Sequence, residues 1–485
     1  MTRPEIEDIY PLTPLQQGML FHTVYAPGSG AYVEQVGFTV RDPELDPGAW
    51  ERAWQRVSER HAVLRTAFAW EEMEEPVQVV HRRAPVPVER LDWSAFPAAE
   101  RAGRLDRWLT EDRRRGFDLL AAPLSRVALI RMGGGEWRVQ WSFHHLLLDG
   151  WSLPRVLDEV LVLCADPGAQ LPRPRPFREY VLWLRRQDAA AAEAFWRGRL
   201  AGFDAPTPLG IGRAAPAGGE DDPAAHAEET VRLAPETAAA LGALARRARV
   251  TPGALVQGAW ALLLSRYSGE EDVVFGAVVS GRPAELPGVE EMVGMFINTL
   301  PVRVRVDEDA PLLPWIAGLH GRQVEAGRFE HVALTDVQGW TGVPREQRLF
   351  ESILAFENYP VGAGAGEGAG RPAINDPRVV ERTGYPLTLV AAPGDGLALR
   401  AVYDTRRLSA GAVRRLLGHW GTLLEAVAAD PERPLRGLPL LTAAEREAAL
   451  AAGAPRRTEW PARRTVVELF EEAAAADGVA GAPRG

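Results

Sequence analysis

Apolar and polar residues alternate from Trp137 to Phe143, and this alternation predicts a half-buried β-strand. The apolar run from Leu124 to Met132 predicts a partner strand, joined to the first across three consecutive glycines. His144 and His145 directly follow the strand that ends at Phe143. Because successive side chains point to opposite sides of a strand, we expect one histidine to face the core and the other a cleft.

Helix starts are marked by capping residues followed by proline. Thr13, Asp46 and Thr251 each precede a proline and an apolar helical stripe, which predicts an N-cap with proline at the first helical position. We expect further helices near residues 98–114, 153–165, 189–200, 235–248 and 410–428. We expect strands near residues 36–40, 66–70, 77–80, 86–91, 272–279, 300–306 and 352–360, and two strands within 389–403.

The stretch 201–228 is rich in Ala, Gly, Pro and Asp and has little apolar periodicity, so it is interpreted as a linker. We therefore expect an N-terminal lobe at residues 1–175, a helical connection and linker at 176–228, and a C-terminal lobe at 229–436. The sequence pattern changes again at residue 437, so residues 437–485 are interpreted as a separate segment after the C-terminal lobe.

Composition narrows the functional classes. The 485 residues are 46% hydrophobic, which allows a large core, and the net charge of −10 without a long basic block argues against nucleic acid as a partner. No apolar stretch has the length of a membrane span, and the N-terminus lacks a signal peptide, so we expect a cytoplasmic protein without membrane contact. The single cysteine, Cys164, excludes an internal disulfide and is interpreted as a core residue.

The densest polar cluster follows the predicted hairpin: His144, His145, Asp149 and Gly150 lie within seven residues. Three interpretations are open: core histidines at a strand end, a metal site, or a catalytic base with Asp149 holding the loop or an imidazole in place. No further cluster of His, Cys or Glu at ligand spacing lies nearby, which disfavours a metal.

A second strand end carries a polar turn, Ser280-Gly281-Arg282-Pro283. Arg282 would meet a carboxylate across a cleft, or the segment is a surface turn. Two more polar side chains, Asn298 and Glu357, lie near the ends of predicted strands and are second candidates for a cleft wall.

Several segments in order resemble the condensation domains of nonribosomal peptide synthetases. His144 to Gly150 matches the HHxxxDG motif of that family, and the resemblance covers roughly residues 5–450. The sequence of the first matching segment, Tyr10 to His22, is similar to that of the subclass that accepts a D-configured donor. The segment Thr383 to Leu387, in contrast, departs from the family pattern. The matching segments read YPLTPLQQGMLFH, RHAVLRT, SGRP and VGMFINT.

The resemblance implies an α/β (α+β) fold of two chloramphenicol-acetyltransferase-like lobes, which form a V-shaped pseudo-dimer with a central tunnel. It implies His145 as the catalytic imidazole, acting as a base or positioning the amine, and a structural role for His144. Asp149 would shape the loop by a salt bridge to Arg282, and Gly150 would let the backbone approach the substrate. Ser280, Gly281, Asn298 and Glu357 are the candidates for the tunnel wall.

The implied reaction is amide bond formation between a peptidyl or aminoacyl thioester donor and an aminoacyl acceptor. Both would arrive on phosphopantetheine arms, one from an upstream and one from a downstream carrier protein, and the domain, expected as a monomer, would bind no cofactor itself. Residues 437–485 resemble a linker and the start of a truncated adenylation domain. The alternatives are a catalytically silent carrier-docking domain of the same fold and a coenzyme A-dependent acyltransferase.

Overall fold

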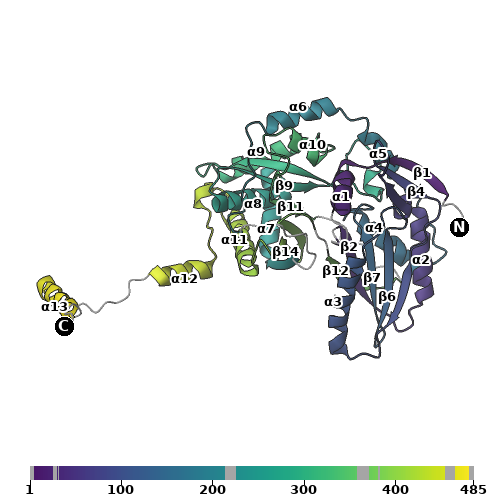
Figure 1. Ribbon diagram of the computed structural model, residues 1–485, viewed down its shortest axis with the longest axis horizontal. Helices are drawn as coiled ribbons and strands as arrows, with labels where there is room; N and C mark the ends of the chain where they lie inside the picture. Colours follow the sequence, from purple (N-terminus) through teal and green to yellow (C-terminus); the bar gives the residue numbers. More distant parts are fainter. Residues whose placement is uncertain are drawn as a thin grey trace, which may run out of the picture. The chain divides into compact units, whose positions relative to one another are not determined.

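A computed structural model describes residues 5–25, 30, 32–212, 226–357, 371–380, 383–453 and 465–479. The chain divides into two compact units, Met1–Leu440 and Leu441–Gly485. The first unit contains two lobes with separate hydrophobic cores, and the second contributes the helices α12 (Ala443–Gly453) and α13 (Val466–Val479) (Figure 1). Residues 213–225, part of the expected linker, lie outside the described residues.

The N-terminal lobe is built on a five-stranded sheet in the order β12-β2-β7-β6-β5. Helices α2 and α4 contribute to the main core against one face, and α3 packs its Leu105 and Trp108 against Ala128 and Ile130 on the other face. A small sheet, β1-β4-β3, completes the lobe. The strands are β1 (Ile6–Pro11), β2 (Val33–Arg41), β3 (Thr66–Ala69), β4 (Val77–His81), β5 (Val88–Asp92), β6 (Ser125–Gly133), β7 (Glu136–His144) and β12 (Ile374–Val380).

Local capping positions the helices of this lobe. The carboxylate of Asp46 accepts from the Gly48 amide, and α2 begins at Pro47, which confirms the predicted cap. Thr13 and Gln16 cap α1 reciprocally, since each side chain accepts from the other's amide. The helices are α1 (Pro14–Tyr25), α2 (Pro47–Arg60), the 3-10 turn η1 (Ala62–Arg65), α3 (Ala98–Arg115) and α4 (Ser152–Ala165).

The predicted hairpin forms between β6 and β7, and its turn uses positive φ angles at all three glycines, Gly133, Gly134 and Gly135. The half-buried character predicted for β7 is wrong, because this central strand is buried on both faces. Two of its polar side chains have hydrogen-bond partners there: Ser142 donates to the Asp112 carboxylate of α3 over 2.6 Å, and Arg138 donates to the Asp376 carbonyl over 3.2 Å. The polar residues of the alternating pattern, Arg138, Gln140 and Ser142, are therefore buried in the fold.

The C-terminal lobe is built on a six-stranded sheet in the order β10-β9-β11-β13-β14-β8, covered by α7, α8 and α11. Trp260 and Trp420 meet edge to face in its core. The strands are β8 (His226–Leu233), β9 (Asp272–Val279), β10 (Asn298–Arg305), β11 (Ser352–Phe356), β13 (Leu387–Gly394) and β14 (Gly396–Asp404). The helices after α4 are α5 (Arg178–Leu184), α6 (Ala189–Arg199), α7 (Pro235–Ala248), α8 (Pro252–Ser268), α9 (Leu312–Gly327), α10 (Leu334–Gly339) and α11 (Ala410–Ala429), with 3-10 turns η3 (Val289–Glu291) and η4 (Leu435–Gly437). Of these, α5 buries Tyr180 and Val181 in the N-terminal core.

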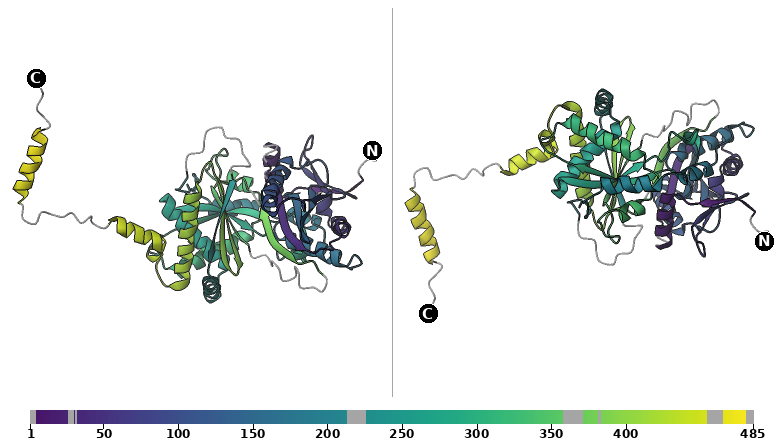
Figure 2. Two further views of the ribbon diagram at one scale, coloured as in Figure 1. Left: turned by 90° about the horizontal axis from the view of Figure 1, so that it is seen from below. Right: turned by 90° about the horizontal axis from the view of Figure 1, so that it is seen from above.

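Two segments cross from the C-terminal half of the unit into the N-terminal lobe. Strand β12 joins the N-terminal sheet by pairing antiparallel with β2, and Figure 2 shows this green strand beside the purple one. The second segment, from Val289 to Phe296, buries its apolar side chains in the N-terminal core. The lobes are thus joined by shared structure as well as by the chain connection.

Candidate functional site

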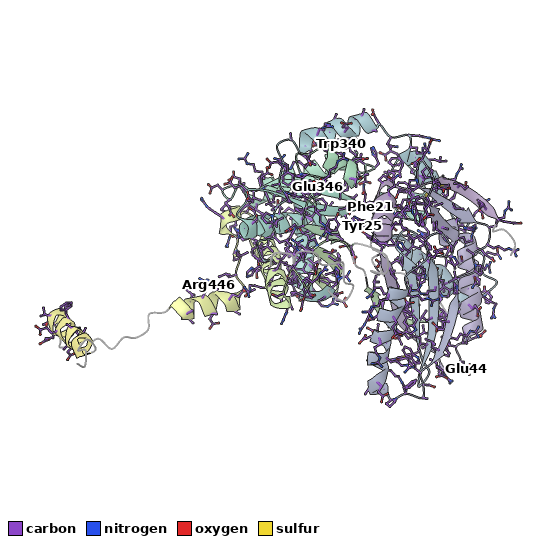
Figure 3. All side chains as sticks on the ribbon, viewed as in Figure 1. Phe21, Tyr25, Glu44, Trp340, Glu346 and Arg446 are labelled. Carbon is purple, nitrogen blue, oxygen red and sulfur yellow. The ribbon has the colours of Figure 1, made fainter. Side chains whose placement is uncertain are left out.

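A cavity of about 1460 Å³ is lined by residues of both lobes. Helix α1, helix α4, strand β2 and the loop after β7 supply its N-terminal side, and α10, β11, β13 and residues 345–350 supply much of the other. Phe21 of α1 and Glu346, both labelled in Figure 3, lie in the wall from opposite lobes. The cavity exceeds the ~300–1,000 Å³ of most small-molecule pockets.

His145 lies in the wall of this cavity. Its amide donates to the Tyr32 carbonyl over 2.8 Å, so the pairing of β7 with β2 continues one residue past the end of β7. The Nδ1 atom lies 3.0 Å from the Leu148 carbonyl. Because a carbonyl only accepts, this contact assigns the proton to Nδ1, and the neutral ring then carries its lone pair on Nε2. The ring can therefore accept a proton or a hydrogen bond through Nε2.

His144 is buried in the core and is absent from the cavity wall. Its Nδ1 accepts from the Leu146 amide over 3.2 Å, and its Nε2 lies 3.3 Å from the Thr23 hydroxyl, which itself donates to the Met19 carbonyl. Burial, and secondarily the neighbouring His145, lowers the pKa of His144 to about 3. The ring is therefore neutral near pH 7 and ties the loop to α1.

The Asp149 carboxylate is buried beneath the loop and meets Arg282 from the other strand end. The Nη2 atom of Arg282 lies 3.1 Å from Asp149 Oδ1, and the two side chains are only 4% and 0% exposed. Asp149 also accepts from the Ser152 amide and hydroxyl over 3.0 and 2.8 Å, and from the Phe296 amide over 3.1 Å. The structure thus brings Asp149 and Arg282 together as a buried pair with its hydrogen bonds largely satisfied.

Arg282 extends this contact to the segment that crosses between the lobes. Its Nη1 donates to the carbonyls of Val289 and Met292 over 2.7 and 3.0 Å, and its guanidinium lies 3.9 Å from the centre of the Phe296 ring. The loop that carries His145 is therefore clamped from behind by the opposite lobe. Such support limits how far the imidazole can move from the cavity.

The remaining candidates divide into two groups. Gly150, Asn298 and Glu357 line the cavity, whereas Ser280 and Gly281, also expected in the tunnel wall, are absent from it. Gly281 instead has a φ of +61° and packs so tightly that an added Cβ would lie 1.8 Å from the Phe296 carbonyl oxygen. The SGRP turn thus supports the site from behind.

The two polar wall residues have backbone or ionic partners. The Asn298 amide donates to the carbonyls of Glu330 and Val332 over 2.8 and 2.7 Å, which ties the start of β10 to the segment that leads into α10. Glu357 Oε1 lies 3.8 Å from the Arg400 guanidinium, which also lines the cavity. Both residues therefore shape the wall.

Strand β2 and the residue before it contribute wall residues that the sequence did not single out: Tyr32, Glu34 and Val36. Glu34 is only 3% exposed and lies between Val33 and Gln35 at the start of its strand. The signal that points to it is a carboxylate two residues before the apolar start of the strand predicted at 36–40, since buried carboxylates are uncommon.

Within the described ranges, no three His, Cys, Asp or Glu side chains converge as metal ligands do. The helices of this described part are also all too short or too polar to span a bilayer.

Comparisons with known proteins agree with this architecture. The family model of the Condensation domain matches residues 6–450. Over 471 residues the chain is 42% identical to one of the linear gramicidin synthase proteins of Brevibacillus parabrevis, covering 96% of this chain and 6% of that protein. It is 43% identical to another protein of the same synthase over 484 residues, covering 97% of this chain and 9% of that protein. The chain therefore spans less than a tenth of the length of these relatives.

Solved structures show the same fold. The first condensation domain of the calcium-dependent antibiotic synthetase, bound to a substrate analogue, aligns with a TM-score of 0.73 at 20% identity, covering 90% of this chain and all 100% of that domain. The starter condensation domain of rhizomide synthetase aligns with a TM-score of 0.75 at 19% identity, covering 90% of this chain and 98% of that domain.

Proposed function

The chain belongs to the Condensation domain family, and on that basis we propose that it is an amide-forming acyltransferase acting on two carrier-bound thioesters. The amine of the aminoacyl acceptor attacks the donor thioester carbonyl. A C–N bond forms, the C–S bond breaks, the amine loses one proton and the donor's thiolate gains one. The donor acyl group is thereby transferred to the acceptor.

The observation that carries the proposal is the position of His145 in a cavity lined by both lobes, with its proton assigned to Nδ1. The lone pair on Nε2 then accepts the proton of the attacking amine, or its hydrogen bond, as the tetrahedral intermediate forms. Because the thioester is already activated, holding the two reactants in attack geometry supplies a large part of the rate enhancement.

The cavity volume suits two long substrates. At about 1460 Å³ it is larger than a pocket for one small molecule, so it has room for the ends of two phosphopantetheine arms beside the imidazole. The proposed partners are an upstream donor carrier, a downstream acceptor carrier and an adjacent adenylation domain, in a cytoplasmic synthetase. The domain itself needs no bound cofactor for this reaction. The same proposal includes the division of the chain into an N-terminal lobe that ends at residue 175, a connection that ends at residue 228 and a C-terminal lobe that ends at residue 436. It also includes the preference for a D-configured donor.

The test measures transfer by intact-protein mass spectrometry. The donor carrier is loaded with an L- or D-terminated dipeptide, and the acceptor carrier with an aminoacyl group. We expect the mass of the acceptor to rise by the dipeptide, and His145→Ala to slow this transfer by about 10²-fold or more. Glu51→Ala, a surface variant in the same lobe, is the matched control, since Glu51 forms a largely exposed ion pair with Arg90.

Each outcome has a distinct meaning. Near-normal transfer by His145→Ala removes the catalytic assignment. Equal use of both donors keeps the reaction and removes the donor subclass. Absence of transfer with every loaded pair favours a docking domain, and turnover of a free coenzyme A thioester without a carrier favours the coenzyme A-dependent alternative.

A further inference from the structure

Glu34 is a buried carboxylate beside the proposed catalytic imidazole. In the antiparallel pairing of β2 with β7, Glu34 is opposite Phe143, and the Tyr32 carbonyl accepts from the His145 amide. Residues two apart on a strand face the same side, so Tyr32, Glu34, Phe143 and His145 share one face of the sheet. All four line the cavity.

The register also gives the separation. Glu34 and His145 are diagonal neighbours across the strand pair, a relationship that places Cα atoms about 7–8 Å apart. Long and aromatic side chains at such diagonal positions are within reach of each other. Glu34 is 3% exposed, so its charge acts in surroundings where solvent screens it weakly.

A guanidinium behind the sheet supports the ionised form of this carboxylate. Burial lowers the pKa of Arg113, and the negative charges of Glu34 and then Asp112 oppose this effect. The same attraction favours the charged form of Glu34. Arg113 also donates to the Gln35 side chain, which fixes the guanidinium against β2.

From this juxtaposition we propose that Glu34 binds the α-ammonium group of the acceptor and guides it to His145. The inference rests on the proposed function. An aminoacyl acceptor enters largely protonated near pH 7, since α-amino groups titrate at about 7.7–8.0. The Glu34 carboxylate attracts this cation into an apolar part of the cavity, and the ammonium then gives its proton to His145 Nε2 or to water before attack.

The experiment varies a soluble acceptor, the glycyl thioester of N-acetylcysteamine, against a fixed loaded donor carrier. Its inhibitor is the propionyl thioether ketone of N-acetylcysteamine, in which a methyl group replaces the ammonium. Glu34→Gln keeps the side-chain shape and removes the charge, and Glu34→Asp keeps the charge on a shorter side chain. Glu44→Gln is the matched control, because Glu44 lies in the same lobe, is exposed and is absent from the cavity wall.

We expect Glu34→Gln to raise the KM for the glycyl acceptor about tenfold or more, as loss of a charge-assisted hydrogen bond does, with a smaller change in Glu34→Asp. Inhibition by the propionyl compound should stay at the wild-type value in both variants. Glu44→Gln should resemble wild type in every measurement. An unchanged acceptor KM in Glu34→Gln, or an equal weakening of acceptor and propionyl compound, overturns the inference and leaves Glu34 a structural partner of Arg113.

A measurement on the wild-type protein keeps the inference testable if Glu34→Gln does not fold. The glycyl thioether ketone should inhibit about tenfold more strongly than its propionyl counterpart, and equal inhibition overturns the inference. Failure of the proposed function itself is distinguishable, because wild-type protein would then transfer no donor to the glycyl thioester.

Discussion

The Nη2 atom of Arg282 lies 3.1 Å from Asp149 Oδ1, and the pair joins the turn after β9 to the loop after β7. Each residue follows a strand of a different lobe, and the two are 133 positions apart in the chain. The contact holds the His145 loop from behind, since Asp149 borders the cavity and Arg282 is absent from its wall. We therefore expect loss of this contact to lower the unfolding free energy directly, and to lower turnover only as a consequence of the displaced loop.

Removing the Arg282 charge should destabilise the first unit strongly. Arg282→Leu leaves the Asp149 carboxylate buried without its cation, which costs about 3–5 kcal/mol of unfolding free energy. Arg52→Leu is the control, because the Arg52–Asp46 pair has side chains 65% and 60% exposed and contributes about 0–1 kcal/mol. Urea unfolding followed by tryptophan fluorescence measures both. Similar losses in the two variants would contradict the buried clamp.

His144 predicts how stability changes with pH. The unfolded ring binds a proton below about pH 6.5, whereas burial keeps the pKa of the folded ring near 3. Between these values the unfolded state binds more protons, so stability falls as pH falls, by up to about 1.4 kcal/mol per pH unit for this group. Above about pH 6.5 its contribution is constant.

The check compares wild type with His144→Asn by urea unfolding at a series of pH values from about 7.5 down to about 4.5, which spans the titration of an unfolded histidine. The amide oxygen of the introduced asparagine can replace Nδ1 as the acceptor for the Leu146 amide, and it does not titrate. We expect the variant to lose less stability than wild type on acidification. Parallel curves over this range would show that His144 titrates with the same pKa in both states.

Gly281 should tolerate a methyl group much less well than another glycine with a similar backbone. Gly281 and Gly269 have φ angles of +61° and +77°, so alanine costs about 1–2 kcal/mol of backbone strain at either position. At Gly281 the new Cβ also meets a backbone oxygen, that of Phe296, whereas at Gly269 it meets open space. We expect a loss above about 3 kcal/mol for Gly281→Ala in urea unfolding. Equal losses would mean that the Phe296 segment moves aside freely.

Asp112 should be as important for the N-terminal sheet as Asp149 is for the loop. Its carboxylate accepts from Gln35, Ser142 and Arg126 over 2.8, 2.6 and 2.5 Å, and thereby ties β2, β6 and β7 to α3. Asp112→Ala leaves a nearly buried Arg126 uncompensated and should cost about 3–5 kcal/mol. Glu51→Ala, which breaks an exposed pair with Arg90, should cost less than about 1 kcal/mol. Equal costs in urea unfolding would contradict the network's role.

Local features of the sequence determined the helix starts and the hairpin. Thr251 accepts from the Ala254 amide and α8 begins at Pro252, as its sequence predicts, because an N-cap involves only residues within one turn. The strand β9 likewise spans the predicted Asp272–Val279. The alternation before His144 and His145 depends on the strand alone, and the structure places the first ring in the core and the second in the cavity wall.

Other features depended on parts of the chain that are distant in sequence. The short, polar strand β12 acquires its partner β2 more than 300 residues away, so its own residues carry no strong strand pattern. Ser280 and Gly281 were expected in the cavity wall, but the packing of Gly281 against the Phe296 carbonyl excludes that position. Glu34 reaches the wall through its register with β7.

Residues close together in the chain were therefore enough to predict most helices and strands, the family resemblance and the candidate imidazole, but not β1, β8 or β12. The tertiary structure alone decided which side chains share the cavity and which support it from behind. The physical reason is that strand register, burial of a second sheet face and the meeting of Arg282 with Asp149 are set by packing between distant segments.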